Sequence, residues 1–223
     1  MSTINPKVFD FLSSLKENNN RAWFEQHKPH FKALEVEVKE FCVQLFDQIS
    51  LHDSLERWKL MRIYRDVRFS KNKTPYKTNF GIAFHRSQPK CRGSYYLQIS
   101  PGNCFLACGF WGPEPKDLLR IRQELAVSGD EFRDLMNQPS FKNTWGELVG
   151  DELKSAPRAF DKNHPEIDLI RKKQFLFMIH FEDHEVEKDG FSGIVNSALK
   201  EVRPFVDFMS DVLTTDLNGA SLV

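Results

Sequence analysis

Apolar residues recur every three or four positions through the first fifty residues, which is the spacing of one face of an α-helix. Asn5 and Pro6 supply an N-cap and a first helical residue, and the asparagines 18–20 end this helix. The same asparagines cap a short helix around Trp23, and Pro29 opens a further helix. The apolar positions of that last helix are Phe31, Leu34, Val38, Phe41, Cys42, Leu45 and Ile49.

In the middle third, apolar and polar residues alternate, as they do on a half-buried β-strand. The alternating runs are Met61–Phe69, Phe80–Phe84, Tyr95–Ile99 and Cys104–Phe110. A Pro-Gly-Asn turn at 101–103 joins the last two runs as a hairpin. Because these strands follow one another through short turns, we expect an antiparallel sheet.

The last third returns mainly to helical spacing. A helix is expected after Pro115, another is capped by Ser128, and residues 141–160 are irregular. A further helix starts near His164, Phe175–Phe181 adds one buried strand, and Phe191–Leu213 forms a long helix kinked at Pro204. The order predicts one α+β domain over residues 1–223, in which an antiparallel sheet from the central third is packed by N-terminal and C-terminal helices.

The balance of charge hides a basic segment. Lys and Arg number 31, as do Asp and Glu, so no overall charge draws the chain to nucleic acid or membranes. Residues 57–92, however, hold eleven basic side chains and one acid, Asp66. Such a segment meets an external anion or is neutralised by acids elsewhere in the fold.

Location follows from absent signals. The N-terminus has no basic leader and no apolar run approaches the roughly 20 residues of a membrane helix, so we expect a cytoplasmic protein with no membrane partner. In that setting the four cysteines are expected to be reduced thiols.

One segment carries a family resemblance: residues 64–78, Tyr-Arg-Asp-Val-Arg-Phe-Ser-Lys-Asn-Lys-Thr-Pro-Tyr-Lys-Thr. It resembles the signature of a widespread, mainly bacterial family of conserved proteins of unknown function. Residues 18–24, 95–111 and 153–175 extend the resemblance, which covers roughly residues 5–215 as a single domain. Gln98 stands where many members carry His. The resemblance implies neither an established activity nor a cofactor.

The basic signature is the strongest candidate site. Arg offers paired planar donors to phosphate or carboxylate, and Lys offers a point charge. We therefore expect an anionic, phosphorylated small molecule as ligand, held by Arg62, Arg65, Arg68, Lys73, Tyr76 and Lys77. In that arrangement Asp66 orients an arginine.

Two alternatives stay open for the same residues. Arg65, predicted on the apolar face of a strand, can be a structural partner of a buried carboxylate. The basic face can also dock an acidic protein or nucleic acid, with nearby aromatic rings stacking on bases.

Signals for chemistry are weaker. The acid–base candidates are Asp66, His85 and His164, and nothing in the sequence shows that they meet, so an enzymatic role stays undecided. The pair Cys104–Cys108 lacks further ligands. Residues 180–184 offer two imidazoles and two carboxylates, but short acidic loops show such a set by chance, so no metal site is predicted. Phosphate-loop, dinucleotide and zinc-protease motifs are missing, and we predict no cofactor.

Overall fold

The computed structural model describes residues 3–223, and within them eight helices and five strands are present. The strands are β1 (Leu55–Leu60), β2 (Phe80–Arg86), β3 (Ser94–Ile99), β4 (Cys104–Phe110) and β5 (Phe175–Phe181). The helices are α1 (Pro6–Glu17), α2 (Arg21–Ser50), α3 (Pro115–Asn137), α4 (Pro139–Trp145), α5 (Ile167–Ile170), α6 (Asp183–Val186), α7 (Phe191–Glu201) and α8 (Arg203–Thr214). The predicted α+β class is confirmed.

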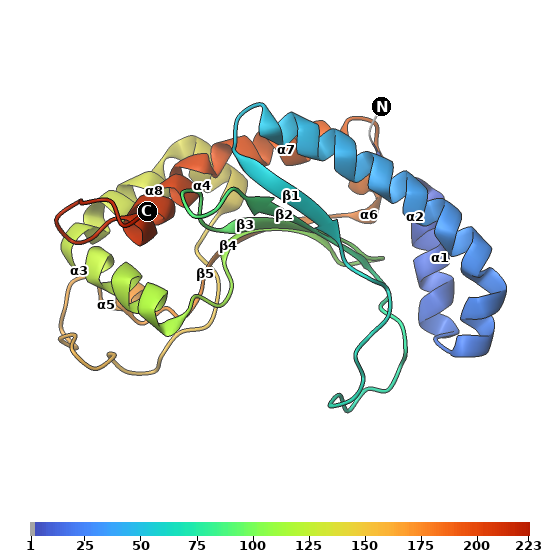
Figure 1. Cartoon of the computed structure of the whole chain (residues 1–223), viewed down its shortest axis with the longest axis horizontal. Coiled ribbons are helices and arrows are strands. Elements are labelled where there is room, and N and C mark those ends of the chain that lie inside the picture. Colours follow the sequence, from blue (N-terminus) through green and yellow to red (C-terminus); the bar gives the residue numbers. More distant parts are fainter. Residues whose placement is uncertain (1–2) are drawn as a thin grey trace.

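The strands form one antiparallel sheet in the order β1-β2-β3-β4-β5. Each strand pairs with its neighbour in the chain, as short connections favour. The sheet curves, with helices above its convex face, and the described residues place no helix layer below its concave face (Figure 1).

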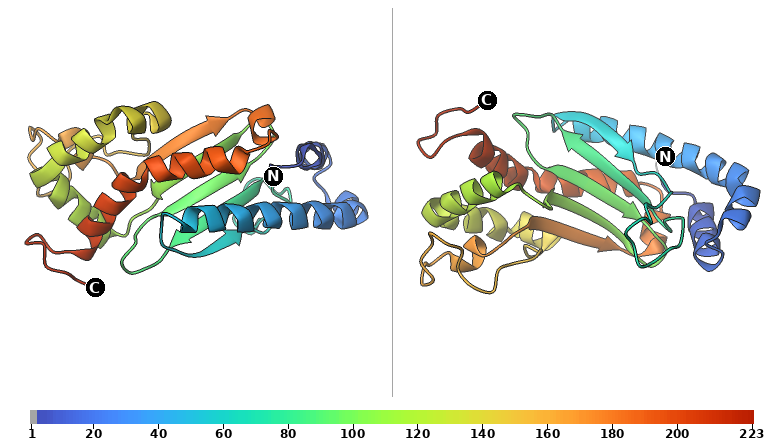
Figure 2. Two further views of the ribbon diagram at one scale, coloured as in Figure 1. Left: turned by 90° about the horizontal axis from the view of Figure 1, so that it is seen from above. Right: turned by 60° about the horizontal axis from the view of Figure 1, so that its bottom comes forward.

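The covered face holds the core. Alternate residues of β2, β3 and β4, such as Phe84, Tyr95 and Leu106, are fully buried there. Helices α2 and α7 cross this face side by side, and α8 continues from α7 (Figure 2, left). Burying one sheet face beneath amphipathic helices is the solution expected for an α+β domain.

The other face of the sheet is left open. The strand register places Ala83, Tyr96 and Ala107 in one row across it, and His85, Ser94 and Gly109 in the next. Helices α3 and α5 lie at one end of this concave face, and the connection between β1 and β2 descends at the other (Figure 1; Figure 2, right). The open face therefore has a wall at each end.

The strand expected over Met61–Phe69 is wrong. Residues 61–79 form an irregular loop, which we call the signature loop, and an isolated bridge between Tyr64 and Tyr76 closes its stem. Ile63 is buried, but Phe69 is 97% exposed, so the alternating apolar residues do not share one buried face. The first strand is instead β1, which the sequence pattern did not predict.

Two proline positions also differ from expectation. Pro29 lies inside the continuous helix α2 and does not open a helix. Phe24 and Phe31 flank it and pack in the core with ring centroids 5.4 Å apart, which offsets the lost backbone hydrogen bond. The helix expected over Phe191–Leu213 is divided: α7 ends at Glu201, and Pro204 lies in the first turn of α8.

Two further boundaries shift. At Ser128, φ −124° and ψ 34° are not helical, so α3 consists of two helical segments that meet in a kink where the sequence predicts a helix start. Part of the segment expected to be irregular forms α4, which buries Phe141 and Trp145.

Candidate functional site

A cavity of about 440 Å³ opens between the end of α1 and the signature loop. We call it the basic cavity. Its lining residues are Lys16, Asn19, Arg65, Asn72, Thr74, Tyr76, Lys77, Thr78 and Asn79. Three of these are cations, and no acidic side chain of the described residues lines the cavity.

Asn19 holds the two walls of the basic cavity together. Its amide Nδ2 donates to the carbonyl oxygen of Tyr76 (3.0 Å), and its Oδ1 accepts from the backbone N–H of Tyr76 (3.1 Å). The Tyr76 ring is buried and stacks on Phe24 of α2, with ring centroids 4.0 Å apart. The turn after α1 is thereby fixed against the signature loop, and with it Lys16 in the last turn of that helix.

Hydrogen bonds within the loop position Arg65. The guanidinium donates to Thr74 Oγ1 (2.5 Å) and to Ser70 Oγ (3.5 Å). Thr74 is itself held by Asn72, whose Oδ1 accepts from the Thr74 backbone and hydroxyl. The sequence left open a buried carboxylate as the partner of Arg65, but its partners here are two hydroxyl groups. Hydroxyl groups are neutral, so they do not neutralise the charge of the guanidinium.

The cations of the basic cavity lack acidic partners. Among the described residues, none forms a salt bridge with Lys16, Arg65 or Lys77. Burial, and then the nearby charge of Arg62, lower the pKa of Lys77 below its ordinary value of 10.5. An anion beside Lys77 acts in the opposite direction, because its charge favours the protonated amine and offsets the repulsion from Arg62.

A second cavity, which we call the sheet groove, lies on the open face and has a volume of about 520 Å³. Its lining residues are Met61, Ala83, His85, Ser94, Tyr95, Tyr96, Gln98, Phe105, Ala107, Cys108, Gly109, Trp111 and Leu176. No Lys, Arg, Asp or Glu of the described residues lines it. The sheet groove is therefore an uncharged neighbour of the basic cavity.

Gln98 joins the two cavities. It lines the sheet groove, and its Oε1 accepts from Nδ2 of Asn79, which lines the basic cavity (3.5 Å). The same oxygen accepts from the Tyr96 hydroxyl (3.4 Å), and Gln98 Nε2 donates to the carbonyl oxygen of Asn103. Gln98, the position at which the resemblance led us to expect His, therefore lies at the junction.

The family model described as Conserved hypothetical protein (DUF2461) matches residues 7–208. The chain belongs to this family. A comparison with curated proteins finds no match. Membership confirms the resemblance inferred from the signature. The description of the DUF2461 family names no activity and no ligand.

The structure separates the predicted ligand residues into two groups. Arg65, Tyr76 and Lys77 line the basic cavity. Arg62, Arg68 and Lys73 do not. Arg68 is paired with Asp66 in the exposed part of the loop, and Lys73 Nζ donates to the carbonyl oxygen of Val67 (3.0 Å).

The acid–base candidates are also separated. His85 lines the sheet groove, and burial and the charge of Arg57 lower its pKa. Asp66 instead orients Arg68 outside both cavities. His164 Nδ1 accepts from the backbone N–H of Glu166, a local contact in the turn before α5. Neither Asp66 nor His164 lines the groove or the basic cavity.

Lys16 and Asn79 are cavity residues that the sequence did not reveal. Lys16 belongs to α1, far along the chain from the signature, and had no local signal beyond being a helix-end lysine. Asn79 directly precedes β2, next to the basic segment, and that position at a strand end was a usable signal.

Part of the basic segment is neutralised inside the fold. Arg86 is 1% exposed on the covered face, where its Nε donates to Asp53 (2.8 Å) and its terminal nitrogens reach Asp53 and Asp207. Arg92, which is partly exposed, pairs with Asp117. Acids of the same chain therefore neutralise these two arginines, whereas the described residues offer Arg65 no acidic partner.

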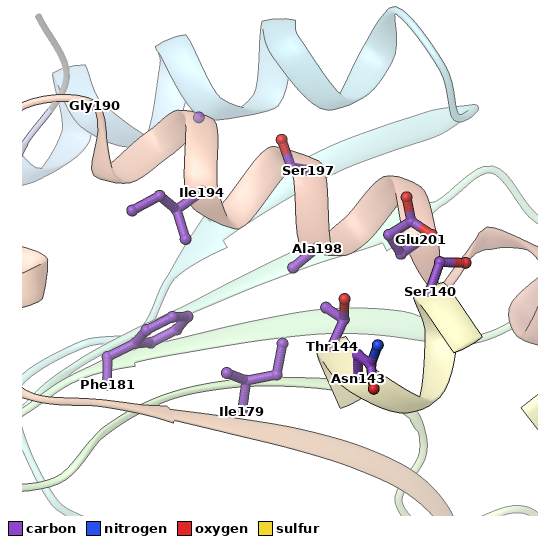
Figure 3. Close-up of a pocket in the computed structure, with 11 residues that line it drawn as sticks. Ser140, Asn143, Thr144, Ile179, Phe181, Gly190, Ile194, Ser197, Ala198 and Glu201 are labelled. Carbon is purple, nitrogen blue, oxygen red and sulfur yellow. The ribbon is translucent and has the colours of Figure 1, made fainter. Parts of the chain in front are cut away.

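A wider cavity of about 800 Å³ lies on the covered side, between β5, α4 and α7. Ile179 and Phe181 lie below it and Ile194 and Ala198 above (Figure 3). Glu201 is the one charged lining residue that the structure describes there, so this cavity offers little to an anion.

Other expected features are simple. All four cysteines are free thiols, and Cys104 and Cys108 lie on the covered face of β4. Burial raises the pKa of Cys104 to about 12, so this thiol is unreactive.

Over residues 3–223, no group of three or more His, Cys, Asp or Glu side chains is placed to hold a metal ion. Within the same range, each helix is too short or too polar to cross a membrane.

Proposed function

We propose that the protein binds the phosphate group of a small phosphorylated molecule in the basic cavity. One observation carries the proposal: Lys16, Arg65 and Lys77 converge on one cavity without an acidic partner among the described residues. Cations held together without counter-charges repel one another, and an anion removes that cost.

The donors suit a phosphate. Arg65 supplies a planar guanidinium, which bonds two oxygens at once, and the lysines add point charges. Thr78 and Asn79 add neutral polar groups at the edge towards the sheet. A phosphate monoester carries up to two negative charges and three terminal oxygens, so it uses more of these donors than a single carboxylate does.

Calorimetric titration with inorganic phosphate tests the proposal. The double variant Arg65→Ala with Lys77→Ala is expected to bind at least about 100-fold more weakly, since two charge-assisted contacts are lost. The matched control is Arg68→Ala with Lys73→Ala, which removes the same charges from the same loop outside the cavity. The control is expected to bind phosphate with nearly unchanged affinity.

Equal losses in both double variants contradict a defined cavity, because they show that overall loop charge attracts the anion. Circular dichroism and the unfolding midpoint show whether each variant is folded. If the cavity variant does not fold, Arg65→Gln alone, which keeps a donor to Thr74, takes its place.

The exposed part of the loop supports a second candidate function. Phe69 is 97% exposed and lies between Arg68 and Lys71. A basic, aromatic tip suits a module that docks nucleic acid or an acidic protein. For that function the Arg68→Ala with Lys73→Ala variant loses polymer binding, and the cavity variant keeps it.

A further inference from the structure

The floor of the sheet groove is flat because its side chains are small. Ala83, Ser94, Ala107 and Gly109 lie in adjacent register positions of β2, β3 and β4 on the open face. At Gly109 no larger residue fits, since φ is +119° and a Cβ would lie 2.1 Å from the carbonyl oxygen of Phe175. The fold therefore builds a recess at this place in the sheet.

Aromatic rings form one side of the recess. Tyr96 leans over Gly81, where a Cβ would meet its hydroxyl oxygen at 2.5 Å, and its hydroxyl donates to Gln98. The Tyr96 and Phe105 rings lie 5.7 Å apart between centroids. Trp111, which is 66% exposed, adds a third aromatic ring to the lining.

This lining suits a flat, uncharged ring with polar edges. Small floor residues and aromatic walls favour stacking, while His85, Ser94 and Gln98 offer hydrogen bonds at the margin. Burial and the neighbouring Arg57 lower the pKa of His85, so the neutral imidazole, both donor and acceptor, prevails at neutral pH. A sugar would require more polar partners than this lining supplies.

The groove meets the basic cavity at the contact between Gln98 and Asn79. A ligand that spans this junction has its phosphate at one end and its ring at the other. We propose that the ligand is a nucleotide unit, with its base on the open sheet face and its phosphate beside Arg65 and Lys77. This inference rests on the proposed phosphate site and adds the class of molecule that carries the phosphate.

A nucleotide unit has two sources, a free nucleotide and a single strand of nucleic acid. Binding to the wild-type protein is measured by calorimetry, and by the fluorescence of its four tryptophans, of which Trp111 lines the groove. The compounds are adenosine, guanosine, cytidine and uridine monophosphates, ribose 5-phosphate, inorganic phosphate and an eight-nucleotide single strand. At least one mononucleotide is expected to bind about tenfold or more tightly than ribose 5-phosphate, because base stacking adds to phosphate binding.

The variant Ala107→Leu tests the position of the base. The added side chain fills the recess without removing core packing, because Ala107 points to the open face. The Ala107→Leu variant is expected to bind the mononucleotide only as tightly as it binds ribose 5-phosphate. Its affinity for ribose 5-phosphate is expected to equal that of the wild-type protein. The matched control, Ala33→Leu, makes the same substitution on the exposed side of α2 and is expected to alter neither affinity.

The outcomes separate the two proposals. If ribose 5-phosphate binds but no mononucleotide binds more tightly, the base site is overturned and the phosphate site stands. If neither inorganic phosphate nor ribose 5-phosphate binds, the proposed phosphate site is wrong, and the nucleotide proposal that rests on it is wrong too. A strand that binds over about tenfold more tightly than a mononucleotide, with a steep salt dependence, identifies nucleic acid as the source. Equal affinities identify the free nucleotide.

Discussion

Arg86 and Arg65 come from the same basic segment, yet the fold uses them in opposite ways. Arg86 lies at 1% exposure on the covered face and bonds to Asp53, to Asp207 and to the hydroxyl of Ser210. Arg65 bonds to two hydroxyl groups and lines a cavity. The difference lies in which acids the fold brings to each arginine.

The acids come from distant parts of the chain. Asp53 precedes β1, and Asp207 belongs to α8. Tyr95 donates its hydroxyl hydrogen to Asp53, which completes the buried network. A buried guanidinium without such partners is too costly to keep, so Arg86 is structural, whereas Arg65 has hydroxyl partners and no acidic partner among the described residues.

The largest expected effect removes the structural arginine. Arg86→Met removes the closer of the two arginines that pair with the buried Asp53 and leaves it only Arg203, at 3.4 Å. This variant is expected to lower the free energy of unfolding by about 3–5 kcal/mol. Arg65→Ala is expected to cost about 1 kcal/mol, the usual net value of a hydrogen bond. Urea unfolding followed by circular dichroism measures both. Similar losses of unfolding free energy in the two variants would show that Arg65 is structural too. The proposed difference between Arg86 and Arg65 would then be wrong.

The next effect concerns the clamp that shapes the basic cavity. Asn19→Ala removes both hydrogen bonds to the buried Tyr76 backbone and is expected to cost about 1–3 kcal/mol of stability. Phosphate binding is expected to weaken as well, since the clamp holds Lys16 near Arg65.

Asn18→Ala is the matched control for the clamp. The Asn18 side chain bonds to Ser14 within α1 and makes no contact with the loop that the structure describes. It is expected to leave phosphate affinity unchanged. A loss of affinity equal to that of Asn19→Ala would show that end fraying of α1, and not the clamp, controls the cavity.

A smaller effect is expected from pH. The pKa of Lys77 lies below 10.5 because of burial and the charge of Arg62. Since the protonated amine binds the anion, sulfate affinity falls as pH rises through this lowered pKa, before ordinary lysines lose their charge. Sulfate is the probe because its own charge is constant over this range.

Two variants sharpen the pH experiment. Arg62→Gln removes the repelling charge and is expected to move the fall in sulfate affinity to higher pH, whereas Arg62→Lys keeps the charge and the wild-type profile. Calorimetric titrations between pH 7.5 and about 10.5 measure the profile, with ellipticity as the check on folding. An unchanged profile in Arg62→Gln would contradict coupling between the two residues.

Local patterns predicted most of the regular structure. Asn5 caps α1 as expected, alternation located β2, β3 and β4, and a concentrated apolar run located β5. The same rule failed at residues 61–69, where alternation occurs in a loop without a buried face. It also missed β1, an edge strand whose exposed residues show no alternation.

The candidate site was predictable only in part. The basic signature located Arg65 and Lys77, since clustered cations are visible in a sequence. Lys16 and the pairing of Arg86 with Asp53 were not predictable, because both depend on contacts between segments far apart in the chain. Charge counting alone cannot tell a neutralised arginine from one that is free to bind.

The smallest expected effect tests the boundary of the cavity. Asp66 is an exposed acid in the signature loop, and its hydrogen bonds with Arg68 lower its pKa. Water screens such an exposed pair, so Asp66→Asn is expected to leave the unfolding midpoint and phosphate affinity at pH 7 within experimental error. Asp53→Asn, the same substitution in the buried network, is expected to destabilise the protein strongly. If Asp66→Asn instead weakened phosphate binding as much as Arg65→Ala, the exposed part of the loop would have to close over the bound anion. Arg68, the partner of Asp66, would then contribute to anion binding together with Arg65, unlike the structural Arg86.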